Sequence, residues 1–246
     1  AEQHIPFPLS QVNVSYQKLN EVFSEKGKMA VQIVAARKNI VDKYIEIVKK
    51  AKLVPRAIEP ETIALGRALG DSPDSPMGTM IVEMGFESSL MVVCYGGNVR
   101  FTRAVPIGGD LMTKTIMQNL NLDYAQAEEY KKVYGLDEFQ GEGKVAGVIS
   151  PVVDNLVTEI KRAILFFTNH NPSATIKRIV MSGGTALMPN LLSYMANKLD
   201  LEVVLANPLS GIEISPKLEK RKQELFEDAA GYSSSIGLAL RGIKNA

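Results

Sequence analysis

Cysteine and tryptophan are nearly absent from the chain, which has one cysteine, Cys94, and no tryptophan. A lone cysteine cannot form an internal disulfide, and the sequence has no Cys/His cluster. We therefore expect a reduced, intracellular protein without a structural zinc site. No run of roughly eighteen apolar residues occurs, and the opening segment AEQHIPFPLS lacks the basic and apolar regions of a signal peptide. The sequence thus predicts neither a spanning helix nor a signal peptide.

An excess of one charge is also missing, because 28 basic residues balance 27 acidic ones. Such a chain has little long-range attraction for nucleic acid or anionic lipid, so we do not expect a general polyanion binder. The hydrophobic fraction of 46% and the charged fraction of 22% are those of a globular protein. They exclude collagen-like, low-complexity and fully disordered classes.

The length of 246 residues favours two modest domains, or one large domain with an insertion. The stretch ALGDSPDSPMG over residues 68–78 collects Gly, Pro, Ser and Asp, and it predicts a boundary. We therefore expect one section over residues 1–69 and another over residues 79–246. Because the first residue is Ala1 and not Met, we interpret the chain as a fragment.

The first section has the pattern of a small α+β unit. The apolar run MAVQIVAA at 29–36 predicts a buried strand, followed by an amphipathic helix that Asn39 caps. The segment LVPRAIEP at 53–60 predicts a short strand, because its prolines prevent continuation of the helix.

The second section begins with the pattern of an antiparallel meander: TMIVEM (79–84), SLMVVCY (89–95) and NVRFTRAV (98–105), with Gly96 and Gly97 in a tight turn. Apolar spacing then predicts helices over 110–120, 123–134 and 149–167, with Asp123 as an N-cap. KRIVMS (177–182) predicts a strand, Pro189 begins a helix, and LEVVLANP (201–208) predicts a last strand. Helices over 216–227 and about 229–240 complete the section.

These strands are expected to form one sheet covered on both faces by helices. We then predict that the strand centres Met80, Val82, Val92, Ile179 and Val204 are nearly buried. Cys94 is expected in the core, on the same face as Met91 and Val93.

The first hairpin, in MIVEMGFESS, combines Glu83, Gly85, Ser88 and Ser89. A glycine-containing turn can bring backbone N–H groups close to a phosphate, and a neighbouring carboxylate can hold a metal-bound water. An ordinary hairpin with polar turn residues explains the same pattern.

Two further segments have the same ambiguity. In MSGGTALMPN, Gly183 and Gly184 separate a strand from a helix and permit close approach of a flat or anionic ligand, although the pattern is neither GxGxxG nor a P-loop. In AEEYKK, Glu128 and Lys131 share one helix face, where they can hydrogen-bond a ribose. A surface ion pair worth about 0.3 kcal/mol is the simpler interpretation of that pair. His4 and His170 have no neighbouring carboxylate and hydroxyl pattern, so no catalytic triad is expected.

Taken in order, these segments resemble the actin-like ATPase superfamily: the acid–glycine–hydroxyl hairpin, FTRAVPIGGDLMT, the AExxK helix and the SGG turn. In detail the chain resembles the PilM family of type IV pilus assembly proteins, through segments such as IPFPLSQVNVSY, VVDNLVTEIKRAILFF and SGGTALMPNL. This resemblance implies an α/β (α+β) fold, with an actin-like, ribonuclease H-like domain and a small inserted α+β subdomain like that of FtsA. Residues 1–69 would be that subdomain with its connecting helix. Residues 79–246 would be the second actin-like half, and the first half would be incomplete.

The resemblance also implies a site for ATP and magnesium. Its phosphate hairpin would contain Gly85, Ser88 and Ser89, its ribose contacts would be Glu128 and Lys131, and its glycines would be Gly108, Gly109, Gly183 and Gly184. Glu83 would reach a metal only through water. The chain departs from the family pattern in three ways: it has no amino-terminal D-x-G hairpin, Glu83 replaces an Asp, and Glu87 lies in the phosphate hairpin. We therefore expect no ATP turnover.

Three functions stay open at this point. The first is a non-catalytic scaffold, cytoplasmic and peripheral on the inner membrane, whose small subdomain binds the cytoplasmic peptide of a PilN-like membrane protein. The second is an ATPase in which Glu83 orients water and Ser88 and Ser89 contact the phosphates. The third is an FtsA-like protein of cell division that polymerises. We expect other pilus assembly proteins as partners, no nucleic acid and no direct membrane insertion.

Overall fold

The computed structural model describes residues 5–19, 29–71, 75, 77–172 and 174–243. They divide into two compact units, residues 1–60 and 61–246, which are described separately. This division lies before the Gly- and Pro-rich stretch at 68–78 that suggested a boundary from composition. The stretch begins within the first helix of the second unit (Glu61–Leu69), and its last residue, Gly78, is the first residue of the sheet.

The first unit contains a short 3-10 turn η1 (Leu9–Gln11), strands β1 (Val12–Lys18) and β2 (Val31–Arg37), and helix α1 (Lys38–Lys50). The strands pair antiparallel, with Tyr16 opposite Ile33. The prediction of a buried strand at 29–36 is wrong, because β2 alternates between exposed and half-buried residues. Within the described residues this sheet has two strands, and a sheet of two strands buries little apolar surface by itself.

Two further predictions for this unit are wrong. Helix α1 begins at Lys38, directly after Arg37, so Asn39 lies inside the first turn and is not the cap. Residues 53–60 form neither helix nor strand. Proline lacks the N–H that a strand ladder needs, and Pro55 and Pro60 lie within this segment.

The second unit begins with helix α2 (Glu61–Leu69) and contains a sheet of five strands in the order β5-β4-β3-β6-β7. The predicted meander is confirmed, since β3, β4 and β5 pair antiparallel, and Gly96 and Gly97 have positive φ in the turn. β6 and β7 run parallel to β3, which confirms the single sheet. The strands are β3 (Gly78–Met84), β4 (Ser89–Tyr95), β5 (Asn98–Val105), β6 (Ile176–Ser182) and β7 (Glu202–Leu205).

The helices of the second unit follow the predicted order. Asp123 caps α4 in a capping box with Gln126, as predicted. α5 is longer than predicted at both ends, and the last two predicted helices each begin with a 3-10 turn. The helices are α3 (Gly109–Leu120), α4 (Tyr124–Tyr134), α5 (Lys144–His170), α6 (Leu191–Leu199), α7 (Lys222–Glu227) and α8 (Ser233–Ala239), and the 3-10 turns are η2 (Gly141–Gly143), η3 (Gly184–Leu187), η4 (Pro216–Arg221) and η5 (Ala229–Tyr232).

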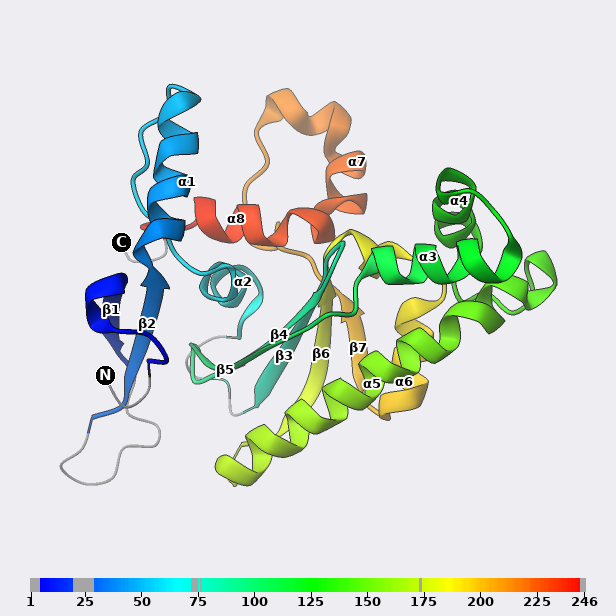
Figure 1. Cartoon of the computed structure of the whole chain (residues 1–246), viewed down its shortest axis with the longest axis horizontal. Helices are drawn as coiled ribbons and strands as arrows, with labels where there is room; N and C mark the ends of the chain where they lie inside the picture. Colours follow the sequence, from blue (N-terminus) through cyan, green and yellow to red (C-terminus); the bar gives the residue numbers. More distant parts are fainter. Residues whose placement is uncertain (1–4, 20–28, 72–74, 76, 173, 244–246) are drawn as a thin grey trace. The chain divides into compact units, whose positions relative to one another are not determined.

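Both faces of the five-stranded sheet are covered by helices. Figure 1 shows α5 crossing one face, with α6 beside it, and the larger core cluster includes residues of both helices. The smaller cluster lies on the opposite face and includes Leu65 of α2 and Ala230 of η5. The prediction for Cys94 is wrong in one respect: it is buried, but in the smaller cluster, whereas Met91 and Val93 belong to the larger one. Neighbouring residues of a strand point to opposite faces.

Burial agrees with the predicted strand centres, with one exception. Met80, Val82, Val92 and Ile179 are fully buried. Val204 is only half-buried, because β7 is a short strand at the edge of the sheet. Within the described residues, no helix combines the length and the apolar character needed to cross a bilayer.

Candidate functional site

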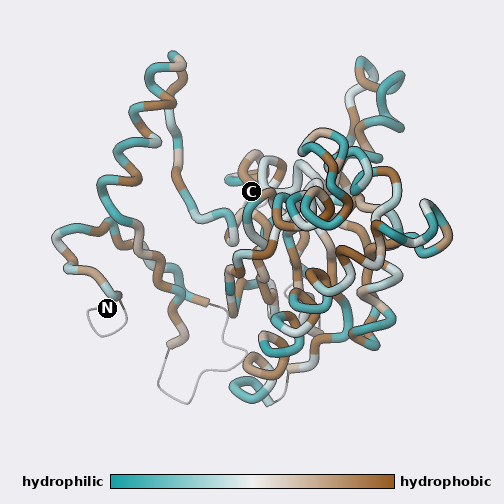
Figure 2. Tube along the Cα trace, turned by 45° about the vertical axis from the view of Figure 1, so that its right-hand side comes forward, coloured by the Kyte–Doolittle hydropathy of each residue, from teal (hydrophilic) through white to brown (hydrophobic). Residues whose placement is uncertain are grey.

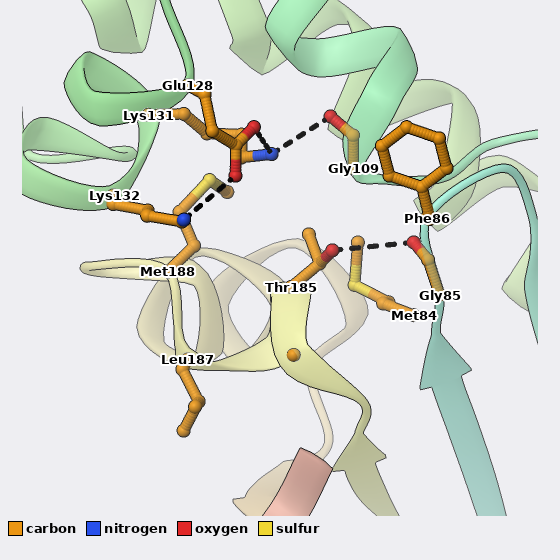
Figure 3. A pocket seen from close by; sticks show the side chains of 11 residues that line it. Met84, Gly85, Phe86, Gly109, Glu128, Lys131, Lys132, Thr185, Leu187 and Met188 are labelled. Atoms are coloured by element: carbon orange, nitrogen blue, oxygen red, sulfur yellow. Dashed lines mark hydrogen bonds and ion pairs between the residues drawn. The ribbon is translucent and has the colours of Figure 1, made fainter. Parts of the chain in front are cut away.

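A cavity of about 480 Å³ lies where the β3–β4 turn, the first turn of α3, helix α4 and η3 meet (Figure 3). One part of its wall is apolar and the other is polar. The apolar residues are Met84, Phe86, Leu187 and Met188, and the others are Gly85, Gly109, Glu128, Lys131, Lys132, Gly184 and Thr185.

The structure brings five of the sequence-predicted residues together in this wall: Gly85, Gly109, Glu128, Lys131 and Gly184. They come from segments up to 99 positions apart in the chain, counted from residue 85 to residue 184. The other predicted residues do not line the cavity.

Gly108 and Gly183 are needed for close packing beside the cavity. A Cβ on Gly108 would lie 2.3 Å from the carbonyl oxygen of Phe86, and a Cβ on Gly183 would lie 2.4 Å from that of Met84. Gly183 also has a φ of +87°, a conformation that L-residues rarely adopt. These glycines therefore let α3 and η3 approach the end of β3.

The two serines lie in or next to the β3–β4 turn. The Ser88 carbonyl accepts a 3.0 Å hydrogen bond from the N–H of Gly85, which closes the turn. Ser89 is buried, and its hydroxyl donates to the carbonyl of Ile107. That hydroxyl therefore holds the chain before α3 against the hairpin.

The first turn of α3 is joined to the hairpin by backbone hydrogen bonds. The N–H of Gly109 donates to the carbonyl of Gly85 at 3.0 Å, and the N–H of Asp110 donates to that of Phe86 at 2.9 Å. Thr185 contributes a weaker contact from η3, with its hydroxyl 3.4 Å from the Gly85 carbonyl. Three elements of the wall, the β3–β4 turn, α3 and η3, are thus joined directly by hydrogen bonds.

Glu128 and Lys131 form an ion pair, but Lys131 is buried, so the surface interpretation of this pair is wrong. The Glu128 Oε2 atom lies 2.7 Å from Lys131 Nζ and 2.6 Å from the Thr113 hydroxyl. Burial alone would raise the pKa of Glu128, but the hydrogen bonds from Lys131 and Thr113 and the charge of Lys131 lower it overall. Glu128 is therefore an ionised acceptor at neutral pH.

Glu83 lies at the same end of β3 but outside the cavity wall. The hydroxyl of Ser234 in α8 lies 2.9 Å from Glu83 Oε2 and 3.0 Å from Glu61 Oε1. Burial and the nearby charge of Glu61 raise the pKa of Glu83 to about 7, although the Ser234 hydrogen bond opposes this shift. Among the described residues, no three His, Cys, Asp or Glu side chains come together as a group that could hold a metal.

Sequence reasoning missed several residues of these two clusters. Lys132 and Thr185 are adjacent to predicted residues, so extending each motif by one position would have found them. Thr113, Glu61 and Ser234 gave no local signal, because each meets its partners only through the tertiary fold.

Comparison with known proteins places the chain among proteins of actin-like fold. A family model described as type IV pilus assembly protein PilM matches residues 1–243. A chain of a PilM–PilN type IV pilus biogenesis complex is 26% identical, with a TM-score of 0.81, over 98% of this chain and 69% of that one. MreB5 of Spiroplasma citri bound to AMPPNP is 13% identical, with a TM-score of 0.62, over 85% of this chain and 66% of that one. At that identity the likeness concerns the fold alone, and it confirms the predicted fold class.

Among curated proteins, cell division protein FtsA of Neisseria meningitidis serogroup B is 22% identical over 228 residues. The match covers 85% of this chain and 53% of that protein. FtsA of Bacillus subtilis (strain 168) is also 22% identical, over 72% of this chain and 44% of the relative. The chain therefore spans about half the length of the curated relatives that it matches.

Proposed function

The chain belongs to the family of type IV pilus assembly proteins PilM, and from this premise we propose that it acts in pilus assembly as a scaffold. In this proposal it lies at the cytoplasmic face of the inner membrane and binds the cytoplasmic amino-terminal peptide of a PilN-type membrane protein. The likeness to a chain of a PilM–PilN complex, over 98% of this chain, is the observation that carries the proposal.

The first unit offers an apolar surface that suits an extended peptide. Directly opposite residues of antiparallel strands share a face, and the register pairs Tyr16 with Ile33. Val14 and Val31 lie on that same face, and all four side chains are exposed. Figure 2 shows hydrophobic residues recurring along this unit. A peptide can add main-chain hydrogen bonds at a strand edge while its side chains contact such a face.

A polar cavity of about 680 Å³ lies in the same unit, lined by Phe7, Ser10, Gln11, Arg37, Lys38, Asn39 and Asp42. Lys38 Nζ donates to the Ser10 carbonyl at 2.7 Å, and the Arg37 guanidinium lies 5.6 Å from the centre of the Phe7 ring. Arg37 is also the last residue of β2, so the cavity adjoins one end of the two-stranded sheet. We assign the polar part of the peptide to this cavity.

The test is a titration of the whole chain with the amino-terminal peptide of the PilN-type protein from the same organism, with a scrambled peptide as control. We expect saturable binding tighter than a Kd of about 1 mM, or about −4 kcal/mol. Tyr16→Ala should weaken binding, whereas Tyr44→Ala, which removes another exposed tyrosine from α1, should not. No saturable binding, or equal effects of both variants, would contradict the assignment to this face.

A second candidate function, nucleotide binding, is favoured by the cavity between the β3–β4 turn, α3, α4 and η3. Its residues fit a nucleoside: an apolar wall can contact a base, and the Glu128 carboxylate can accept hydrogen bonds from ribose hydroxyls. Glu83 lies outside the wall, so we assign it no direct contact with a metal. ATP, when bound with magnesium, would supply a triphosphate for this chain to hold.

The nucleotide proposal is tested by thermal unfolding with ATP, with and without magnesium. Binding to the native state raises the midpoint in a concentration-dependent way. Gly184→Val should abolish the shift by filling the cavity, since no atom lies within 4 Å of the position of its Cβ. Gly147→Ala, at an equally open position in α5, is the matched control.

Hydrolysis is tested separately by phosphate release from magnesium-ATP. We expect the release to equal a buffer blank. Phosphate release above the blank that disappears in Glu83→Ala would favour the ATPase instead.

A further inference from the structure

The buried ammonium of Lys131 has no hydrogen-bonding capacity left for a ligand. Its side chain is 7% exposed. Lys131 Nζ lies 3.1 Å from the carbonyl oxygen of Gly109, 2.8 Å from the Thr113 hydroxyl and 2.7 Å from Glu128 Oε2. An ammonium has three donors, and here three acceptors surround it. A ligand would have to break one of these bonds to contact Lys131.

The neighbouring residue Lys132 is exposed, in contrast to Lys131. Its side chain is 70% exposed, and its ammonium lies 3.3 Å from Glu128 Oε1, the carboxylate oxygen that Lys131 does not contact. An exposed ion pair of this kind is weak and readily rearranged. Figure 3 shows Lys131 directed toward the first turn of α3 and Lys132 on the other side of Glu128.

The contacts of Lys131 continue through the first turn of α3 into the hairpin. The Gly109 carbonyl accepts from Lys131, while the Gly109 N–H donates to Gly85 in the β3–β4 turn. We propose that Lys131 is a positioning residue, which fixes α4 to the first turn of α3 and thereby to the β3–β4 hairpin, and that Lys132 and Glu128 Oε1 form the pair that a ligand meets.

This assignment depends on the proposed nucleotide site only for the identity of the ligand. A ligand that fits must offer donors to Glu128 Oε1 and an acceptor to Lys132. A ribose provides both through its hydroxyl groups. Lys131 fixes the positions of this Glu128–Lys132 pair and of the β3–β4 turn, and it does not contact the ligand.

The first experiment measures lysine acetylation of the whole folded chain by mass spectrometry. Lys132 should react rapidly. Lys131 should react at least about tenfold more slowly, because its amine is reached only after local opening. Equal acetylation rates at the two lysines would overturn the positioning role.

The second experiment follows hydrogen exchange of the Gly109 and Asp110 amides, which donate to the Gly85 and Phe86 carbonyls of the β3–β4 turn. Lys131→Met should accelerate exchange there by about tenfold, whereas Lys132→Met should leave it unchanged. If Lys131→Met does not fold, Thr113→Val removes one acceptor of the same network at nearly constant shape, and Thr113→Ser, which keeps the hydroxyl, should restore slow exchange. Unchanged exchange in Thr113→Val would contradict the coupling of α4 to the hairpin.

ATP is the probe for the ligand-facing pair. It should protect Lys132, and not Lys131, from acetylation, and Lys132→Met should weaken ATP binding by about fivefold, which a single exposed charge can supply. Protection of Lys131 alone would show that ATP contacts Lys131 and not Lys132, and it would overturn the proposal. If ATP protects neither lysine and does not shift the unfolding midpoint, the nucleotide function fails, while the acetylation and exchange results still decide the role of Lys131.

Discussion

The two units of the chain use their apolar residues differently. The second unit buries them on both faces of a five-stranded sheet, in clusters that include the centres of β3, β4 and β6. The described residues of the first unit bury only Val12 and Leu19, and much of the apolar side-chain surface of β1, β2 and α1 stays exposed. Burial of apolar surface is the main favourable term in folding. The second unit therefore specifies its own fold, whereas the first leaves apolar side chains exposed, and these are the side chains to which the proposed peptide contact is assigned.

The largest expected effect comes from one substitution made in both units. Ile179→Ala removes a fully buried side chain from β6 and should lower the free energy of unfolding by about 2–5 kcal/mol. Ile33→Ala, at a position 43% exposed in β2, should change it by less than about 0.5 kcal/mol. Urea unfolding of both variants measures the difference. Similar losses in the two variants would show that the first unit has a core of its own.

A smaller loss is expected where two helices of the second unit touch through a glycine. A Cβ on Gly237 of α8 would lie 2.0 Å from the carbonyl oxygen of Ala64 in α2. Gly237→Ala should therefore force the helices apart and destabilise the unit by about 1–3 kcal/mol. Gly231→Ala is the matched control, because no atom lies within 4 Å of its Cβ position. Thermal unfolding should separate the two variants, and equal midpoints would refute the tight contact.

The buried carboxyl of Glu83 predicts a dependence of stability on pH. Its pKa is about 7 in the folded chain against 4.5 as its ordinary value, so the folded state binds the proton more tightly than the unfolded state. The resulting stabilisation is complete below pH 4.5 and is lost as the pH rises through 7. Solvent reaches part of this side chain, so we discount the effect to about 1–2 kcal/mol.

Glu83→Gln removes this titration and keeps a hydrogen-bonding side chain. We measure the free energy of unfolding with urea at pH 5 and at pH 8.5. Between these two pH values it should fall by about 1–2 kcal/mol more in the wild-type chain than in the variant. Glu87→Gln, in the exposed turn nearby, controls for the loss of one negative charge. A wild-type pH profile that is parallel to that of Glu83→Gln would mean that Glu83 is ionised throughout.

What could be predicted from the sequence depends on how far apart the interacting residues are. The meander, the Gly96–Gly97 turn and the Asp123 cap follow from neighbouring residues, and all three are confirmed. The burial of Lys131 does not follow from its neighbours, because Gly109 and Thr113 reach it from another helix. The same holds for Glu83, whose partner Ser234 is 151 positions away.

In the first unit, the sequence has the local pattern of a buried strand, but the described part of the fold does not bury that strand. The run MAVQIVAA has the composition of a buried strand, yet β2 has one neighbour and a half-exposed surface. Propensity describes which side chains suit a strand and does not supply the second layer that would bury it. The prediction for Cys94 chose the wrong face of β4. Residues two positions apart in a strand share a face, so Cys94 lies with Val92 and not with Met91 or Val93.

A loss of about 1 kcal/mol is expected from Asp123→Ala, which removes the cap of α4 and its reciprocal bond with Gln126. Helix α1 of the first unit starts after Arg37, with no side-chain cap. Arg37→Ala should therefore leave helix content unchanged, while Asp123→Ala lowers the unfolding midpoint. Circular dichroism during heating measures both quantities. A loss of helix signal in Arg37→Ala would show that α1 depends on this position for a reason other than capping.

The smallest effect is expected from the ion pair between Glu46 and Lys50 on α1. Their charged atoms lie 2.7 Å apart, but the side chains are 62% and 74% exposed. Water and salt screen such a pair, so Lys50→Gln should lower stability by only about 0.3–0.5 kcal/mol, and less still at high salt. Thr113→Val, which alters the buried Lys131 network of the second unit, should exceed that loss and should not depend on salt. Urea unfolding at low and high salt measures both variants. If Lys50→Gln gave the larger and salt-independent loss, the first unit would hold its charged groups as rigidly as the second.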